Sequence, residues 1–346
     1  MRKILLVCVV SLWTAVSFAQ ETQWAAVEGK ISTPWAEQVN PESPLPEHPR
    51  PQMVRNTWLN LNGLWDYVIT PVGTSVSNSY DGKILVPFAV ESSLSGVGRK
   101  VGKDSVLIYN RTITLPSDFR KKKVLLHFGA VDWKCEVSVN GTAIGSHTGG
   151  YDPFSFDITS ALKRSGAQEI KVTVWDPSDG GPQPRGKQVK TPKGIWYTSV
   201  TGIWQTVWLE AVPQTYIKSV KITTDPDQGT VTLKGDIDAT QSGDRLKMSV
   251  WDGTQKIAEG DSEQAEVSLT IPDAKRWSPA SPFLYDVRIT LVRKGKTVDE
   301  VRSYFGMRTI SVAADSKGIQ RMLLNDEMLF QYGPLDQGWW PDGLYT

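Results

Sequence analysis

A long succession of short segments, in which apolar and polar residues alternate between turns, most constrains how this chain can fold. Alternation of period two places one face of a strand against a core and the other toward solvent. Asn140-Gly141 follows one such run, and Asn-Gly is a strong hairpin signal because both central turn residues need positive φ. Helix evidence in the first part of the chain is one weak turn near residues 160–163. The pattern predicts a nearly all-β protein built as a sandwich or jelly roll.

The alternating runs divide into two units with a segment on either side. Residues 52–211 form the first predicted unit. Residues 212–308 hold six or seven expected strands in about 95 residues, which is the spacing of an immunoglobulin-like sandwich, without the cysteine pair of an antibody domain. Residues 20–51 are rich in proline and are predicted to be an extended leader over the surface. Residues 309–346 contain one short hairpin and fewer residues than a domain needs.

The first 19 residues read as a secretory signal peptide. Arg2 and Lys3 give a charged start, an apolar stretch follows, and small residues precede Ala19. We therefore expect cleavage after Ala19 and a secreted or periplasmic protein. Cys135 would then remain as a single cysteine in an alternating strand, where it is expected to be a buried small hydrophobe.

Charge and motif content exclude several classes of function. The chain carries 38 Lys and Arg against 37 Asp and Glu, so neither nucleic acid nor an anionic membrane is an expected partner. Its three histidines lack metal-ligand spacing, and there is no cysteine cluster, so no metal is expected. Nucleophile-elbow and Walker motifs are absent from the sequence, and no cofactor is predicted.

The most informative segment is the connection 176–203, which joins two strands that otherwise look adjacent. Connections of this length inside compact domains are usually functional or disordered, and its aromatic residues argue against disorder. Indole rings suit the apolar faces of a pyranose, and charged or amide groups suit its hydroxyl rim. Alternatively, Trp196 and Trp204 cap the core and the charged groups are only solvated. The sugar-contact hypothesis rests on Asp176, Asp179, Arg185, Lys187, Gln188, Trp196 and Tyr197.

A set of motifs, taken in their order along the chain, resembles glycoside hydrolase family 2, which includes β-galactosidases and β-glucuronidases. The first unit resembles the family's sugar-binding jelly roll, the second its immunoglobulin-like domain, and the tail the start of its catalytic (β/α)8 barrel. The motifs are Leu61-Asn62-Gly63-Leu64-Trp65, Tyr109-Asn110-Arg111, Val139-Asn140-Gly141, Gly149-Gly150-Tyr151-Asp152-Pro153-Phe154, Thr201-Gly202-Ile203-Trp204-Gln205, Trp277-Ser278-Pro279, Phe305-Gly306-Met307-Arg308 and Leu324-Asn325.

The resemblance implies the non-catalytic N-terminal part of a secreted, retaining exo-β-glycosidase, most like a β-galactosidase. A barrel needs about 250 residues, and only about 38 follow Arg308. Both catalytic glutamates are therefore expected beyond Thr346, and this chain alone should be inactive. The family's Gly-Val-Asn-x-His segment is replaced here by Tyr332-Gly333-Pro334-Leu335-Asp336, and Gln205 stands where many members have arginine.

The resemblance also implies site residues and a partner. The loop 176–203 would line the subsite for the terminal sugar of a β-glycoside, with Asp179 contacting a hydroxyl. Asp336, Trp339 and Trp340 would lie near the first barrel strand and could face the same sugar. An incomplete barrel should leave four apolar residues exposed, namely Leu335, Trp339, Trp340 and Leu344.

Two rival interpretations come from other classes of protein. One is a stand-alone carbohydrate-binding protein, and the other is a structural array of β-sandwiches. The motifs after Phe305 disfavour both. The sequence leaves open which sugar is recognised and whether the protein is an oligomer.

Overall fold

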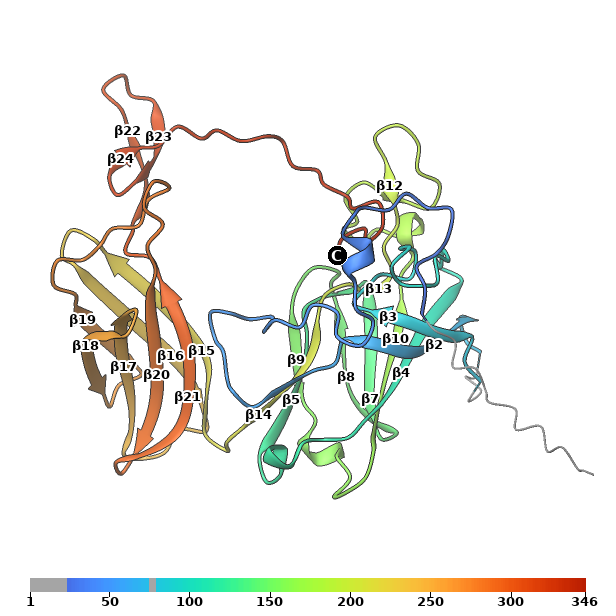
Figure 1. Ribbon diagram of the computed structural model, residues 1–346, viewed down its shortest axis with the longest axis horizontal. Coiled ribbons are helices and arrows are strands. Elements are labelled where there is room, and N and C mark those ends of the chain that lie inside the picture. Colours follow the sequence, from blue (N-terminus) through green and yellow to red (C-terminus); the bar gives the residue numbers. More distant parts are fainter. Residues whose placement is uncertain (1–23, 75–78) are drawn as a thin grey trace, which may run out of the picture.

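The computed structural model describes residues 24–74 and 79–346, and within these ranges the regular secondary structure is almost entirely β-strand (Figure 1). The signal-peptide prediction falls on residues 1–19, which lie outside the described residues. The predicted all-β class is confirmed. In the described part of the chain, the helical elements are four short 3-10 turns, and none is long or apolar enough to span a membrane. The turns are η1 (Ala36–Gln38), η2 (Ser117–Phe119), η3 (Thr159–Ala161) and η4 (Ser178–Gly180).

The first sandwich is formed by a six-stranded and a four-stranded antiparallel sheet (Figure 1). The six-stranded sheet has the order β3 (Gly82–Val86), β2 (Gly63–Pro71), β4 (Ser105–Ile113), β10 (Gln168–Trp175), β7 (Lys134–Val139) and β8 (Thr142–Thr148). The four-stranded sheet has the order β1 (Trp58–Asn60), β14 (Val207–Val212), β5 (Lys123–Phe128) and β9 (Phe154–Asp157).

Sequence alternation explains why these sheets face each other. In β10, buried and half-buried residues alternate along all eight positions, so every second side chain enters the core. The predicted hairpin at Asn140-Gly141 is confirmed, because both residues have positive φ and join β7 to β8. The register of the sheets is thus set by which face of each strand is apolar.

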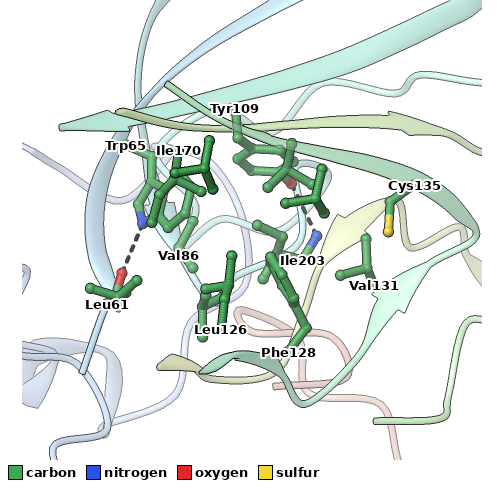
Figure 2. Packing of buried hydrophobic residues seen from close by; sticks show 14 of the residues in the cluster. Leu61, Trp65, Val86, Tyr109, Leu126, Phe128, Val131, Cys135, Ile170 and Ile203 are labelled. Carbon is green, nitrogen blue, oxygen red and sulfur yellow. Dashed lines mark hydrogen bonds between the residues drawn. The ribbon is translucent and has the colours of Figure 1, made fainter. Parts of the chain in front are cut away.

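Large aromatic and aliphatic side chains fill the space between the two sheets (Figure 2). Trp65 and Tyr109 come from the six-stranded sheet, and Leu126 and Phe128 come from the four-stranded sheet. The buried Trp65 indole donates a hydrogen bond of 2.9 Å to the Leu61 carbonyl, so its polar atom is satisfied. Each such side chain stabilises the fold by about 1.5–3 kcal/mol relative to exposure. The expected burial of Cys135 is confirmed in this core.

The second sandwich contains seven strands, in agreement with the predicted number. Its core is mostly aliphatic, with Leu233, Ile289 and Val301 buried between the sheets beside the aromatic Tyr285 and Phe305. One sheet has the order β15 (Tyr216–Asp225), β16 (Thr230–Asp238) and β19 (Glu266–Thr270). The other has the order β18 (Gln255–Ser262), β17 (Asp244–Asp252), β20 (Tyr285–Arg293) and β21 (Lys296–Phe305).

The tail begins as a small antiparallel sheet and then returns to the first sandwich in an extended path (Figure 1). Asn325 and Asp326 have positive φ and form the turn between the last two strands, which confirms the short predicted hairpin. Leu335 is 83% exposed, as expected, but the expected exposure of Leu344 is wrong, because it packs against the first sandwich and is 7% exposed. That this segment begins a barrel stays a prediction. The strands are β22 (Ile310–Ala314), β23 (Gln320–Leu324) and β24 (Glu327–Met328).

Candidate functional site

The loop 176–203 crosses from one sheet of the first sandwich to the other. It leaves β10 in the six-stranded sheet and leads to β14 in the four-stranded sheet, so the expectation that it joins adjacent strands is wrong. Within it, β11 (Gln188–Val189) and β12 (Tyr197–Thr198) pair in parallel, and β13 (Gly202–Ile203) pairs with β6 (Val131–Asp132). The β11–β12 pair, here called the ribbon, gives the loop an ordered backbone.

Asp176, at the start of the loop, is turned inward and is only 2% exposed. Its carboxylate accepts hydrogen bonds from the Ser178 amide at 2.8 Å and from the Thr201 hydroxyl at 2.9 Å. These bonds join the first and last parts of the loop. In this conformation Asp176 holds the loop in place and offers no surface to a sugar, unlike the role predicted for it.

Asp179 lies three residues further along and is exposed. Its Oδ2 accepts a hydrogen bond of 3.2 Å from the amide of Lys190, which directly follows β11. The second carboxylate oxygen has no protein hydrogen bond in the described part of the chain. An exposed carboxylate with a free oxygen, fixed by the loop backbone, can accept hydrogen bonds from sugar hydroxyl groups.

The other predicted loop residues lie at different depths. Trp196 is 43% exposed near the ribbon, and Ile195 beside it is 67% exposed. Arg185 is half-buried, with a long contact of 3.4 Å from Nη1 to the Gly181 carbonyl. Trp196 therefore offers an accessible ring for stacking, whereas Arg185 is part of the loop's own packing.

Five aromatic side chains from three segments of the chain form a cluster at the ribbon, namely Tyr151, Tyr197, Trp204, Trp339 and Tyr345. The Tyr197 and Trp339 rings stack nearly parallel, with centroids 5.0 Å apart and an angle of 8°. The Trp339 ring also lies 4.3 Å from that of Tyr345, which in turn is 4.8 Å from that of Trp204. The hydroxyl groups of Tyr151 and Tyr345 are 2.9 Å apart. Tyr151 and Tyr345 were not predicted as site residues, although Tyr151 lies in one of the family motifs.

The remaining predicted residues in the tail lie apart from this cluster. Trp340 packs edge-on against Trp35 of the leader, with centroids 5.6 Å apart, and is 49% exposed. Asp336 is exposed and accepts a hydrogen bond of 2.7 Å from the Gly338 amide. The structure therefore brings Trp339 to the loop but places neither Trp340 nor Asp336 in contact with it.

Three carboxyl groups lie buried beneath the loop, and two of them were not identified from the sequence. Glu91 accepts a hydrogen bond of 2.9 Å from the Thr201 amide, and its other oxygen has no partner within the described residues. Asp132 contacts Gln188 Nε2 at 3.3 Å. Burial raises the pKa of Glu91 to about 8 and that of Asp132 to about 7, and it also raises the pKa of Asp176. Glu91 therefore holds a proton at neutral pH, and Asp132 holds one below about pH 7.

We expect the buried carboxyl groups of Glu91 and Asp132 to make the protein less stable as pH rises from about 5 to about 8. Both pKa values are raised in the folded state, so over this window the folded chain still holds protons that the unfolded chain has already lost. Each group can contribute a loss of up to about 1.4 kcal/mol per pH unit. Urea unfolding at several pH values, with Glu91→Gln for comparison, measures the slope. A wild-type slope equal to that of Glu91→Gln would contradict the role of Glu91.

Among the described residues, no group of three or more His, Cys, Asp or Glu side chains is arranged to hold a metal ion. What the loop does offer is an exposed carboxylate, an exposed indole and a rigid aromatic support. This arrangement suits recognition of a polyhydroxylated ligand with apolar C–H faces. The three carboxyl groups beneath the loop are buried.

Two family models match this chain, and together they cover more than half of it. The model described as "Glycosyl hydrolase 2 galactose-binding domain-like" matches residues 90–197. The model described as "Glycosyl hydrolases family 2" matches residues 215–308. The first match includes the carboxylates Asp132 and Asp179 and most of the loop, and the second covers the second sandwich.

Curated relatives and solved structures agree with these matches. A β-galactosidase of Thermoanaerobacter pseudethanolicus is 25% identical over 75% of this chain and 36% of its own length. A putative β-glucuronidase of Formosa agariphila is 29% identical over 59% of this chain and 19% of its own length. The apo structure of a β-glucuronidase from Ruminococcus gnavus has a TM-score of 0.66 at 20% identity, covering 81% of this chain and 49% of that one. This chain spans half or less of the length of these proteins.

Proposed function

Because this chain belongs to glycoside hydrolase family 2, we propose that it is the sugar-binding, non-catalytic N-terminal part of a secreted exo-β-glycosidase of the β-galactosidase type. The observation that carries the proposal is the exposed Asp179 carboxylate, fixed by the Lys190 amide at 3.2 Å, in the same loop as the exposed ring of Trp196. The loop would line the subsite for the terminal sugar, with Asp179 accepting a hydrogen bond from a sugar hydroxyl.

The catalytic step is proposed to lie outside this chain. Retaining hydrolysis uses two carboxyl groups about 5–5.5 Å apart, one as nucleophile and one as acid and base. Glu91, Asp132 and Asp176 lie beneath the loop with little exposure, which supports a structural role for them. The complex of the Ruminococcus gnavus β-glucuronidase with D-glucuronic acid supports a sugar as the ligand.

Export and domain boundaries belong to the same proposal. Residues 1–19 would be removed as a signal peptide, in support of which stand the charged start and the small residues before Ala19. Residues 52–211 and 212–308 would be the two folding units, which is supported by two separate cores. Residues 309–346 would lead into a catalytic barrel.

Replacing Asp179 with alanine is expected to weaken monosaccharide binding by at least about tenfold. A hydrogen bond from a hydroxyl to a charged group contributes about 1.5–3 kcal/mol, and 1.4 kcal/mol corresponds to a factor of ten. Titration of the protein with D-galactose and with D-glucuronate, followed by NMR, measures the affinity.

Two further variants make the result specific. Asp179→Asn keeps an acceptor for the Lys190 amide, so it separates loss of the sugar contact from loss of the loop's own bond. Asp236→Ala removes a carboxylate that is 60% exposed in the second sandwich and should bind as wild type does. Equal affinity of the wild type and Asp179→Ala would refute the assigned contact.

A further inference from the structure

The last ten residues of the chain contact the ribbon. Trp339 stacks on Tyr197 of β12, as described above. Tyr345 accepts a hydrogen bond of 2.9 Å from Gln188 Nε2 of β11. Lys187, one residue before β11, donates to Gln337 Oε1 at 2.5 Å. Residues 337–346, here called the clamp, therefore contact both strands of the ribbon.

Gln188 connects the clamp to the body of the loop. Its Oε1 accepts a hydrogen bond of 2.6 Å from the Val200 amide, and its Nε2 reaches the hydroxyl groups of Tyr345 and Tyr151 at 2.9 and 3.2 Å. Gln188 is 2% exposed, so these bonds do not compete with solvent. A shift of Tyr345 would remove the shortest contact of Gln188 Nε2 and leave it the longer ones to Tyr151 at 3.2 Å and Asp132 at 3.3 Å.

The clamp is itself fixed to the first sandwich and to the leader. Asp342 Oδ2 accepts hydrogen bonds from the amide and hydroxyl of Thr33 at 2.6 and 2.7 Å. The Thr346 hydroxyl lies 2.6 Å from the Trp204 carbonyl and 3.0 Å from the Pro87 carbonyl. Leu344 is buried against Ala89 and Val200. Because the clamp is bonded to both the sandwich and the ribbon, it can restrict movement of the ribbon relative to the sandwich.

The ribbon in turn holds the proposed sugar contact. Lys190 directly follows β11, and its amide is the group that fixes the Asp179 carboxylate. Trp196 directly precedes β12, on which Trp339 stacks. Movement of the ribbon would therefore displace both Asp179 and Trp196.

We propose that the clamp holds the ribbon in the conformation that binds sugar, and that Trp339 and Tyr345 are positioning residues of this site. We rest this inference on the proposed function. Trp339 then acts on the site through Tyr197 and does not face the sugar. Trp339 uses one ring face on Tyr197 and packs against Tyr345, and its indole nitrogen is buried.

Hydrogen exchange of the full chain tests the inference without any ligand. In Trp339→Ala, amides of residues 187–199 should exchange at least about tenfold faster than in the wild type, while the strands of both sandwiches stay unchanged. Trp339→Phe keeps an aromatic ring on Tyr197 and should remain close to wild type. Trp251→Ala removes a tryptophan of β17 in the second sandwich and serves as the matched control. Unchanged exchange of 187–199 in Trp339→Ala would overturn the clamp.

A second variant covers the case in which Trp339→Ala fails to fold. Tyr345→Phe removes a single hydroxyl from the Gln188 network and should also speed exchange in the ribbon. Sugar affinity then tests whether the ribbon must be held in place for binding. Variants with faster ribbon exchange should bind D-galactose or D-glucuronate more weakly, and undiminished affinity in them would overturn the positioning role of the clamp. If the wild type binds neither sugar, the proposed function fails, whereas the exchange experiment still decides whether the clamp holds the ribbon.

Discussion

Replacing Gly202 with alanine is expected to lower the free energy of unfolding by about 3–5 kcal/mol. Gly202 has φ +94°, a conformation that costs an alanine about 1–3 kcal/mol. An added Cβ would lie 2.0 Å from the hydroxyl oxygen of Tyr109 and 3.0 Å from Leu107 Cδ2. Tyr109 is fully buried, so its ring cannot move aside without disturbing the core, which costs about another 1–3 kcal/mol.

A double variant identifies the physical cause of this loss. The Tyr109 hydroxyl accepts a hydrogen bond of 3.2 Å from the Ile203 amide (Figure 2). Tyr109→Phe removes both that bond and the clashing oxygen, so adding it to Gly202→Ala should recover more than about 1 kcal/mol although it destabilises the wild type. Denaturant unfolding of the four proteins measures the cycle. A loss below about 1 kcal/mol in Gly202→Ala would show that the backbone adjusts freely here.

Replacing Arg55 with methionine is expected to cost about 3–5 kcal/mol, because this guanidinium joins the two sandwiches. Arg55 is 4% exposed and lies 2.8 Å from Asp299 of β21 and 3.4 Å from Glu210 of β14. It also donates to the Ile217 carbonyl. Removing one partner of a buried ion pair leaves an uncompensated charge, which is the costly case.

Glu210 shows how strongly this junction is charged. Its side chain has no exposed surface and pairs with Arg50 at 2.8 Å. Burial alone would raise the pKa of Glu210, but the hydrogen bond from His127 and the charges of Arg50 and Arg55 lower it to about 2. This carboxylate therefore stabilises the fold above the ordinary glutamate pKa, and the contribution is lost as pH falls toward 2.

Calorimetry of Arg55→Met beside Arg302→Met checks the prediction. Arg302 lies on β21, as Asp299 does, but it is exposed and its side chain donates a hydrogen bond of 2.9 Å to Asn56, so its loss should cost no more than about 1 kcal/mol. In Arg55→Met the two sandwiches should also melt less cooperatively. Equal stability of the two variants would contradict a junction stabilised by Arg55.

The fold could be predicted because the patterns that determine its strands and turns lie within short segments of the sequence. Alternation of period two in segments such as β10, and turn residues such as Asn140-Gly141, are visible in short windows of sequence. Short windows of sequence do not show which strands belong to the same sheet. The strands on either side of the loop therefore seemed adjacent. They lie in different sheets because the loop crosses the end of the sandwich.

The candidate site was only partly predictable for the same reason. Asp179 and Trp196 lie within one loop of suitable composition, and the structure leaves both exposed. Trp339 and Tyr345 contact the loop across 142 and 157 residues of sequence, and contacts of that kind leave no local pattern. Glu91 precedes two serines and resembles a solvated turn, yet all three residues are buried.

One measurement tests the central claim most directly: titration of the unsubstituted 346-residue chain with D-galactose and D-glucuronate, with release of nitrophenol from their nitrophenyl β-glycosides monitored in parallel. We expect saturable binding of a sugar at the loop of Asp179 and no hydrolysis above the rate in buffer. Hydrolysis by this chain would place a catalytic carboxylate pair within it and contradict a non-catalytic role. Absence of any sugar binding would contradict the assignment of the loop.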